Sequence, residues 1–135
     1  MPTVAQAGAI AFKIVRGLPL ILLVRARQNP EHWIFPKGHI DDGETAEIAA
    51  SRELEEEAAI KAELVASVGA LEFQSGNERL HVEYFLFKYT DDIERTEERE
   101  TRWCAYEEAL ALLSHRDAAD LLRRARPLID RYAAG

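Results

Sequence analysis

Three closely spaced glutamates, Glu53, Glu56 and Glu57, are the residues of this chain best suited to chemistry. In a helix that begins near Glu44 and turns by about 100° per residue, they fall within one arc of about 100°. Three small residues, typical of the side of a helix that packs inward, point the same way: Ala46, Ala49 and Ala50. Burying like charges together costs several kcal/mol per ion unless a cation compensates them. The pattern predicts a divalent metal site, and hard carboxylate oxygens favour Mg²⁺, with Mn²⁺ also acceptable.

The alternative interpretation of this helix is an ordinary surface helix with solvated glutamates. Glu47 and Glu55 point well away from the three clustered glutamates, and they fit that description. The helix alone therefore leaves the metal site and the solvated surface as equal alternatives.

The loop before the helix, WIFPKGHIDDGE, favours the metal site. Pro36 and Gly43 break regular structure, and Gly38 lets backbone atoms approach a ligand closely. Lys37 and His39 flank Gly38, and both side chains can contact phosphate oxygens. Together the loop and the helix predict a site where metal-binding carboxylates lie beside groups that bind phosphate.

The same segment resembles the Nudix box, whose pattern is G-x5-E-x7-R-E-U-x-E-E-x-G-U, with U a bulky aliphatic residue. Residues 38–60, GHIDDGETAEIAASRELEEEAAI, match every fixed position except one. Ala59 stands where the family has glycine, which ends the helix and allows a positive φ. Because alanine in that conformation costs about 1 kcal/mol, we expect a slightly altered turn at Ala59 and no loss of activity.

The resemblance implies an α/β fold, a Nudix-type α/β/α sandwich with a mixed β-sheet, in which residues 1–135 form a single domain. It also implies the reaction, which is metal-dependent hydrolysis of a pyrophosphate bond by attack of water at phosphorus. By the same resemblance Glu53, Glu56 and Glu57 bind Mg²⁺ or Mn²⁺, and the carbonyl of Gly38 is also near the metal.

Further roles follow from the resemblance. Arg52 would hold a box glutamate, which we take to be Glu44, through a charge-assisted hydrogen bond. Either Glu56 or Glu53 would act as the general base that takes a proton from water. A further ligand from outside the box has two candidates, each of them alternatively a surface residue: Glu100 and Glu97.

The residues from Trp33 to His39, with the spacing W-x-x-P-K-G-H, resemble the loop of the asymmetric diadenosine tetra- and hexaphosphate hydrolases within this family. That subgroup implies a diadenosine polyphosphate substrate, with Lys37 at the phosphates and aromatic side chains stacked on adenine. Tyr84 is the leading stacking candidate, with a core position as the equal alternative. His39 either contacts the substrate or braces the loop. Two further residues are candidates for facing the same groove: His81 and Lys88.

Other functions stay open as alternatives. Oxidised nucleoside triphosphates and diphosphoinositol polyphosphates are also cleaved by Nudix enzymes. The second class needs many cations, which this loop does not offer, so we rank it below the dinucleotides. A catalytically silent nucleotide-binding module would have lost box glutamates, and all of them are present.

The composition fits an enzyme of small molecules. The chain has 135 residues and a formal net charge of −7, so we expect no binding to nucleic acid or to an anionic membrane. A small-molecule nucleotide is then the expected partner, and the protein is expected to be a monomer or a homodimer. Cys104 is the only cysteine, and the first residues lack a signal-peptide pattern, so we expect a cytoplasmic location.

The hydrophobic pattern predicts a mixture of strands and helices. Strands are predicted at residues 4–15, 18–25, 33–35, 61–73 and 80–89 and near Trp103. Helices are predicted from about residue 44 and over residues 106–113 and 117–132, and a solvated charged loop over residues 90–100. Residues 80–89 carry large apolar side chains on both faces, which predicts a central strand covered on both sides.

Overall fold

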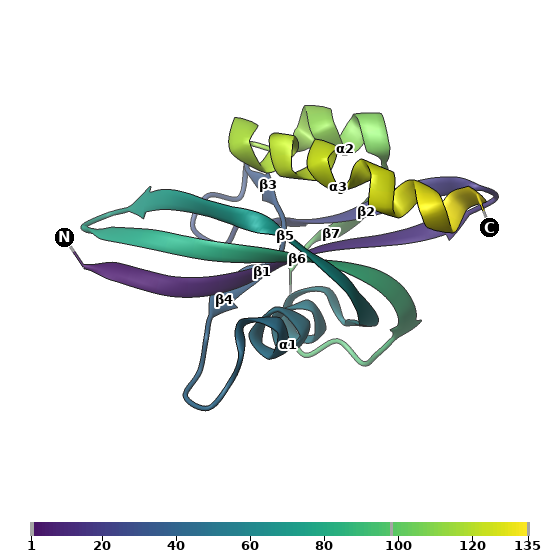
Figure 1. The fold of residues 1–135 in the computed structure, drawn as a ribbon. Helices are drawn as coiled ribbons and strands as arrows, with labels where there is room; N and C mark the ends of the chain where they lie inside the picture. Colours follow the sequence, from purple (N-terminus) through teal and green to yellow (C-terminus); the bar gives the residue numbers. More distant parts are fainter. Residues whose placement is uncertain (1, 98, 135) are drawn as a thin grey trace.

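The computed structural model describes residues 2–97 and 99–134. The elements in chain order are β1 (Thr3–Val15), β2 (Leu18–Arg25), β3 (Trp33–Ile34), β4 (Lys37–His39), α1 (Ala46–Ala58), β5 (Ile60–Ser75), β6 (Glu78–Asp92), β7 (Thr101–Ala105), α2 (Tyr106–Leu112) and α3 (Arg116–Ala134). A twisted sheet lies between α1 on one side and α2 and α3 on the other (Figure 1). The predicted α/β/α sandwich is confirmed.

The sheet is mixed, as predicted. Its strands pair in the order β3-β2-β1-β6-β5, while β4 pairs with β1 and β7 pairs with β2. β1 and β6 are parallel, and the other pairings between these strands are antiparallel. Trp33 and Leu113 form an isolated parallel bridge. The predicted hairpin of β1 and β2 is present, and its turn at Arg16 and Gly17 has the positive φ angles typical of tight hairpins.

β6 is the central strand that its sequence predicts, since it lies between β1 and β5. Side chains on one of its faces belong to the core under α2 and α3: Leu80, Val82, Tyr84 and Leu86. Side chains on the other face belong to the core under α1: Phe85 and Phe87. The sheet therefore carries one hydrophobic core on each face.

α2 and α3 close the first of these cores. α3 buries Leu121, Leu122 and Ile129 against the sheet, which agrees with their helical spacing in the sequence. Cys104 of β7 is buried in the same core. Within residues 2–97 and 99–134, no helix combines the length and the apolar character that a membrane crossing requires.

β4 is a short strand that the sequence analysis did not predict. It pairs with β1, so that Lys37 lies opposite Gly8 and Gly38 lies opposite Ala7. The carbonyl of Pro36, just before β4, accepts a hydrogen bond of 3.0 Å from the backbone N–H of Ala9. Proline and glycine argued against a strand here, but a three-residue strand does not need a donor from Pro36. The pairing fixes the loop against the sheet.

Local caps define the ends of α1. Thr45 is the N-cap, and its side-chain oxygen accepts a hydrogen bond of 3.2 Å from the backbone N–H of Ile48. At the other end Ala59 has φ 57° and ψ 44°, and its N–H donates to the carbonyl of Glu55. Our expectation of an altered turn at Ala59 is therefore wrong: the left-handed conformation is kept despite the alanine methyl group.

Candidate active site

β4 and α1 meet so closely at Gly38 that any side chain there would displace the carboxylate of Glu53. A Cβ atom added to Gly38 would lie 2.3 Å from Oε1 of Glu53 on the helix. The contact brings the backbone of β4 directly over a carboxylate. Gly38, at the beginning of the box, therefore lies beside Glu53 on the helix, although many residues separate the two in the sequence.

Around this contact lies a hollow of about 520 Å³, which we call the carboxylate cavity. Its lining includes the three box glutamates and residues of both charges from other segments: Gln6, Arg27, Lys37, Gly38, His39, Glu53, Glu56, Glu57, Glu78 and Arg99. A cavity with this lining can hold a cation against the carboxylates and an anion against the basic side chains.

Two of the three clustered glutamates are buried. Glu53 is 8 % exposed and Glu57 is 5 % exposed, whereas the side chain of Glu56 is 48 % exposed. The expectation that all three point inward is wrong for Glu56, which lies at the mouth of the cavity. Glu53 and Glu57 are one turn apart and share the inward face, while Glu56 is rotated from Glu57 by about 100°.

Arg52 joins the loop to the helix. Its Nε and Nη2 donate to the two carboxylate oxygens of Glu44 at 2.8 and 2.9 Å, and its Nη1 donates to Glu53 at 2.9 Å. Nη2 also donates to the backbone carbonyl of His39 at 2.9 Å. The expected contact between Arg52 and Glu44 is present, and it lowers the pKa of Glu44. The arrangement holds Glu53 in a fixed orientation.

Arg99 is a second arginine at the carboxylates, and the sequence analysis did not single it out. Its side chain is only 10 % exposed, and its Nη1 donates to Oε1 of Glu57 at 2.9 Å. The prediction that residues 90–100 form a solvated loop is thus wrong for Arg99, and β6 also extends into this range, to Asp92. The sequence predicts a metal as the compensating charge for these buried carboxylates. In the structure, guanidinium groups of Arg52 and Arg99 provide that charge.

The two candidates for an outside ligand lie in different places. Glu97 is partly buried and forms an ion pair with Arg99, whose Nη2 lies 2.8 Å from Oε1 of Glu97. Glu100 is exposed, pairs with Arg25 at 3.2 Å and does not line the carboxylate cavity. Glu97 is also outside the lining of that cavity, but Arg99 links it to Glu57 by pairing with both carboxylates.

Burial perturbs the charges of this cavity. It raises the pKa of Glu57 to about 9, with a hydrogen bond to Glu53 as the second cause. Burial also lowers the pKa of Lys37, although nearby Glu57 and Glu53 oppose that effect. Crowding disfavours a second negative charge beside Glu53, and a divalent cation at these carboxylates would offset that cost.

The donor set fits a hard divalent metal. Carboxylate oxygens of Glu53, Glu56 and Glu57 and the backbone of Gly38 line one cavity, and hard cations of the Mg²⁺ type prefer oxygen ligands. Within residues 2–97 and 99–134, however, no three acidic, histidine or cysteine side chains are already arranged to hold a metal ion. Arg52 and Arg99 engage one oxygen each of Glu53 and Glu57, so a metal at these carboxylates would share or replace those partners.

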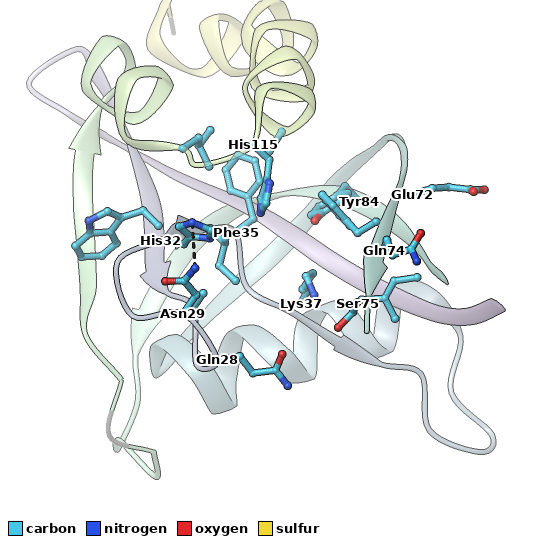
Figure 2. A pocket seen from close by; sticks show the side chains of 17 residues that line it. Gln28, Asn29, His32, Phe35, Lys37, Glu72, Gln74, Ser75, Tyr84 and His115 are labelled. Atoms are coloured by element: carbon cyan, nitrogen blue, oxygen red, sulfur yellow. Dashed lines mark hydrogen bonds between the residues drawn. The ribbon is translucent and has the colours of Figure 1, made fainter. Parts of the chain in front are cut away.

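A second hollow of about 510 Å³ adjoins the first, and we call it the aromatic cavity (Figure 2). Rings from separate segments line it: His32, Trp33, Phe35, Phe73, Tyr84 and His115. His115 lies 5.3 Å from the ring of Phe73 and 5.6 Å from that of His32, centroid to centroid. Its pKa is lowered, first by burial and then by the charge of His32. Polar side chains at the rim include Gln28, Asn29 and Gln74.

The two cavities form one cleft because six residues line both of them. The shared residues are Ala26, Gln28, Ile34, Lys37, Ser75 and Leu80. Lys37 lies at the junction, where its Nζ donates to Oε1 of Gln6 at 3.2 Å. The cleft therefore runs from aromatic walls, past a lysine, to carboxylates.

Tyr84 lies in the core at the wall of the aromatic cavity. It is 2 % exposed, its ring is edge-on to Phe35 at 6.0 Å, and it covers Gly8, where a Cβ atom would lie 2.4 Å from Cε1. Little of the ring is therefore accessible for stacking. Phe73 is only partly buried, and it offers more ring surface to this cavity.

The other predicted contacts with substrate are divided. His39 lines the carboxylate cavity with an exposed side chain, and its carbonyl braces Arg52. His81 pairs with Glu72 at 3.2 Å, and Lys88 lies 5.9 Å from the ring centre of Tyr132. Neither His81 nor Lys88 is part of the lining of the two cavities.

Comparisons with known proteins agree with this geometry. The model of the NUDIX domain family matches residues 4–125. The bis(5'-nucleosyl)-tetraphosphatase (asymmetrical) of Caenorhabditis elegans is 32 % identical over 128 residues, which cover 90 % of this chain and 93 % of that protein. Diphosphoinositol polyphosphate phosphohydrolase 3-alpha of Mus musculus is 32 % identical over 114 residues, covering 80 % and 68 %. A crystal structure of a C. elegans Ap4A hydrolase binary complex superposes with a TM-score of 0.77 at 28 % identity, covering 93 % of this chain and 97 % of that one.

Proposed function

The chain belongs to the NUDIX family of hydrolases that act on pyrophosphate bonds, and we propose that its substrate is a diadenosine polyphosphate. One observation carries this proposal: the carboxylate cavity continues into the aromatic cavity, with Lys37 at the junction. A nucleotide matches this order of groups, since a base suits aromatic walls and phosphates suit a lysine beside metal-binding carboxylates.

Under this proposal Mg²⁺, or Mn²⁺ in its place, is held by Glu53, Glu56, Glu57 and the carbonyl of Gly38, and it supplies charge to stabilise the phosphate oxygens. Arg52 keeps Glu44 and Glu53 in position. A box glutamate takes the proton of the water that attacks phosphorus, as the bond from phosphorus to the bridging oxygen breaks. Glu56 and Glu53 are the two candidates, and the exposed side chain of Glu56 has easier access to water.

Substrate contacts are proposed on both sides of Lys37. Lys37 and the exposed His39 bind phosphate oxygens, and Phe73 stacks on the base with Tyr84 as the wall behind it. A metal ligand from outside the box is proposed at Glu97, since Glu100 is exposed and paired with Arg25.

A diphosphoinositol polyphosphate fits the cleft less well. Its dense negative charge calls for many cations, whereas the basic residues lining the carboxylate cavity are Arg27, Lys37 and Arg99, together with His39. Arg27 and Arg99 already pair with Glu97. A phosphorylated inositol ring has no group that would complement the aromatic cavity. An oxidised nucleoside triphosphate would use both cavities and is the second candidate.

The remaining proposals concern the setting of the enzyme. We propose that residues 1–135 act as one domain, as a monomer or homodimer in the cytoplasm, on a small-molecule nucleotide. The net charge of −7 supports the proposal that nucleic acid and anionic membranes are not its partners.

The test is a panel of substrates with Mg²⁺ and with Mn²⁺, with products separated by chromatography. Diadenosine tetraphosphate and hexaphosphate, an oxidised nucleoside triphosphate and a diphosphoinositol polyphosphate are compared at equal concentration. We expect the highest kcat/KM for a diadenosine polyphosphate, release of ATP and AMP from the tetraphosphate, and loss of activity in EDTA. A higher kcat/KM for either other class would replace the proposed substrate. Failure to cleave any of them with either metal would remove the proposed reaction.

A further inference from the structure

Two arginines that line the carboxylate cavity form ion pairs, Arg27 and Arg99, and Arg99 is the less exposed of the two. Its guanidinium bridges two carboxylates, with Nη1 at 2.9 Å from Oε1 of Glu57 and Nη2 at 2.8 Å from Oε1 of Glu97. It comes from the segment before β7, far from the box in the sequence. The side chain is therefore placed by tertiary structure against the carboxylate that is buried most deeply in the box.

Arg27 provides an internal comparison. It lines the same cavity and pairs with the same Glu97, but its side chain is 69 % exposed and its ion pair does not include Glu57. Two arginines thus share Glu97, and Arg99 alone of the two also contacts the box. If Arg99 affects the binding of a metal at Glu57, the corresponding effect of Arg27 should be absent or much weaker.

A divalent cation bound at Glu57 would compete with the guanidinium of Arg99 for Oε1, the carboxylate oxygen that Nη1 contacts at 2.9 Å. Oε1 of Glu57 accepts a hydrogen bond from Arg99, and an oxygen engaged in a close ion pair is a weaker metal ligand until that pair opens. Once opened, Arg99 has no room to remain between the metal and Glu57, because two positive centres would then be adjacent. The nearest polar surroundings are those of the cavity it already lines, with Lys37 and His39.

We infer that Arg99 is an exchangeable counter-ion, which pairs with Glu57 before the metal binds and binds the phosphate oxygens of the nucleotide afterwards. This inference rests on the proposed function. The released guanidinium has the planar fork of donors that suits phosphate, and it lies on the same cavity as Lys37. Arg99 would thereby couple the two binding events, because the arginine that leaves Glu57 when a metal is bound would be available to the phosphates of the substrate.

The inference makes two predictions of opposite sign for the variant Arg99→Gln. Mn²⁺ alone should bind about tenfold more tightly, because the competing cation is gone, within the usual range of coupling between sites. A non-hydrolysable, methylene-bridged diadenosine tetraphosphate should bind about tenfold more weakly in the presence of metal, because a phosphate ligand is gone. A residue with only a structural role would weaken both.

The experiment measures free Mn²⁺ by electron paramagnetic resonance and analogue binding by calorimetry, for the full chain and four variants. Arg27→Gln is the matched control, for which Mn²⁺ affinity should change less than twofold. Arg99→Lys keeps the charge and loses the fork, so its Mn²⁺ affinity should lie between those of the native chain and Arg99→Gln. If Arg99→Gln fails to fold in EDTA, Arg99→Lys is the deciding variant. An Mn²⁺ affinity of Arg99→Lys equal to that of the native chain then overturns the inference.

The variant Glu57→Gln distinguishes a failure of this inference from a failure of the proposed function. If Glu57→Gln weakens Mn²⁺ binding while Arg99→Gln leaves it unchanged or weaker, the exchange is wrong and the metal site stands. If Glu57→Gln leaves Mn²⁺ binding unchanged, the proposed metal site itself is wrong. Unchanged analogue binding in Arg99→Gln, with tighter Mn²⁺, also overturns the inference, because the arginine then never reaches the phosphates.

Discussion

The carboxylate cavity and the aromatic cavity adjoin each other, yet the chain builds them differently. The box carboxylates of the first come from one continuous segment, residues 38–57, while its basic and other polar groups come from β1, the loop after β2, β4, the β5–β6 hairpin and the segment before β7. The second takes its walls from the loop after β2, from β3, from the β5–β6 hairpin and from the connection between α2 and α3. Reaction chemistry is thus encoded locally, whereas recognition of the substrate depends on tertiary packing.

The electrostatics of the two cavities differ in the same sense. In the carboxylate cavity, Glu53 and Glu57 are buried and each pairs with an arginine. The aromatic cavity carries mainly rings and neutral amides, with Lys37 and the carboxylate of Glu72 as its basic and acidic lining residues. Substitutions in the first cavity should therefore affect mainly kcat, and substitutions in the second mainly KM.

The largest expected effect is that of Glu57→Gln. Losing one metal-binding oxygen and its charge should lower kcat by about 100-fold or more, in the range found when a charge-stabilising group is removed. Stability in EDTA should be similar, because the amide oxygen can still accept from Arg99 and the amide N–H can donate to Glu53. Steady-state kinetics with Mg²⁺ and urea unfolding in EDTA measure the two quantities.

Glu55→Gln is the control for that variant, since Glu55 lies on the same helix and outside both cavities. Its kcat should stay within twofold of the native value. An unchanged kcat in Glu57→Gln would remove this glutamate from the mechanism, and equal losses in both variants would point to the helix and not to the site.

The aromatic cavity is tested by Phe73→Ala. Stacking of a base on an aromatic ring contributes about 1–3 kcal/mol by alanine substitution, so we expect KM for diadenosine tetraphosphate to rise by about tenfold with kcat nearly unchanged. Tyr132→Ala is the control, because it truncates an exposed aromatic side chain outside both cavities. If kcat fell and KM did not change, the division of roles between the two cavities would be wrong.

The pH dependence of stability should distinguish the carboxylate cavity from the aromatic cavity in the absence of substrate. The pKa of Glu57 is raised to about 9 by burial, so the folded chain holds a proton that the unfolded chain releases near its ordinary pKa of 4.5. The contribution of Glu57 to stability is therefore complete below pH 4.5 and is lost as the pH rises toward 9. In EDTA, the urea midpoint of Glu57→Gln should match that of the native chain at pH 6 and exceed it at pH 9. A constant difference between pH 6 and pH 9 would contradict the raised pKa.

The sequence predicts the fold and the box well because both rest on local signals. Periodicity marked every long element, and the spacing from Gly38 to Ile60 marked the carboxylates. Arg99 could not be found in this way, since it sits within a run of charges that is usually solvated. Phe73 and His115 carry no motif, and they become neighbours only when β5 packs beside the start of α3. Tyr84 was chosen for its type, but its partner Gly8, which buries it, is remote in the sequence.

The smallest expected effect concerns Ala59, the one departure from the box pattern. Its φ of 57° is unfavourable for alanine by about 1 kcal/mol, so Ala59→Gly should stabilise the fold by up to about 1 kcal/mol. Ala58→Gly is a closely matched control: it is also buried, but it lies in the helix, where glycine should destabilise by about 1 kcal/mol. Urea unfolding in EDTA measures both. Because Ala59 touches neither cavity, kcat and KM should stay unchanged in Ala59→Gly; a change in either would mean that the helix end tunes the site and that the box chemistry is less local than its sequence suggests.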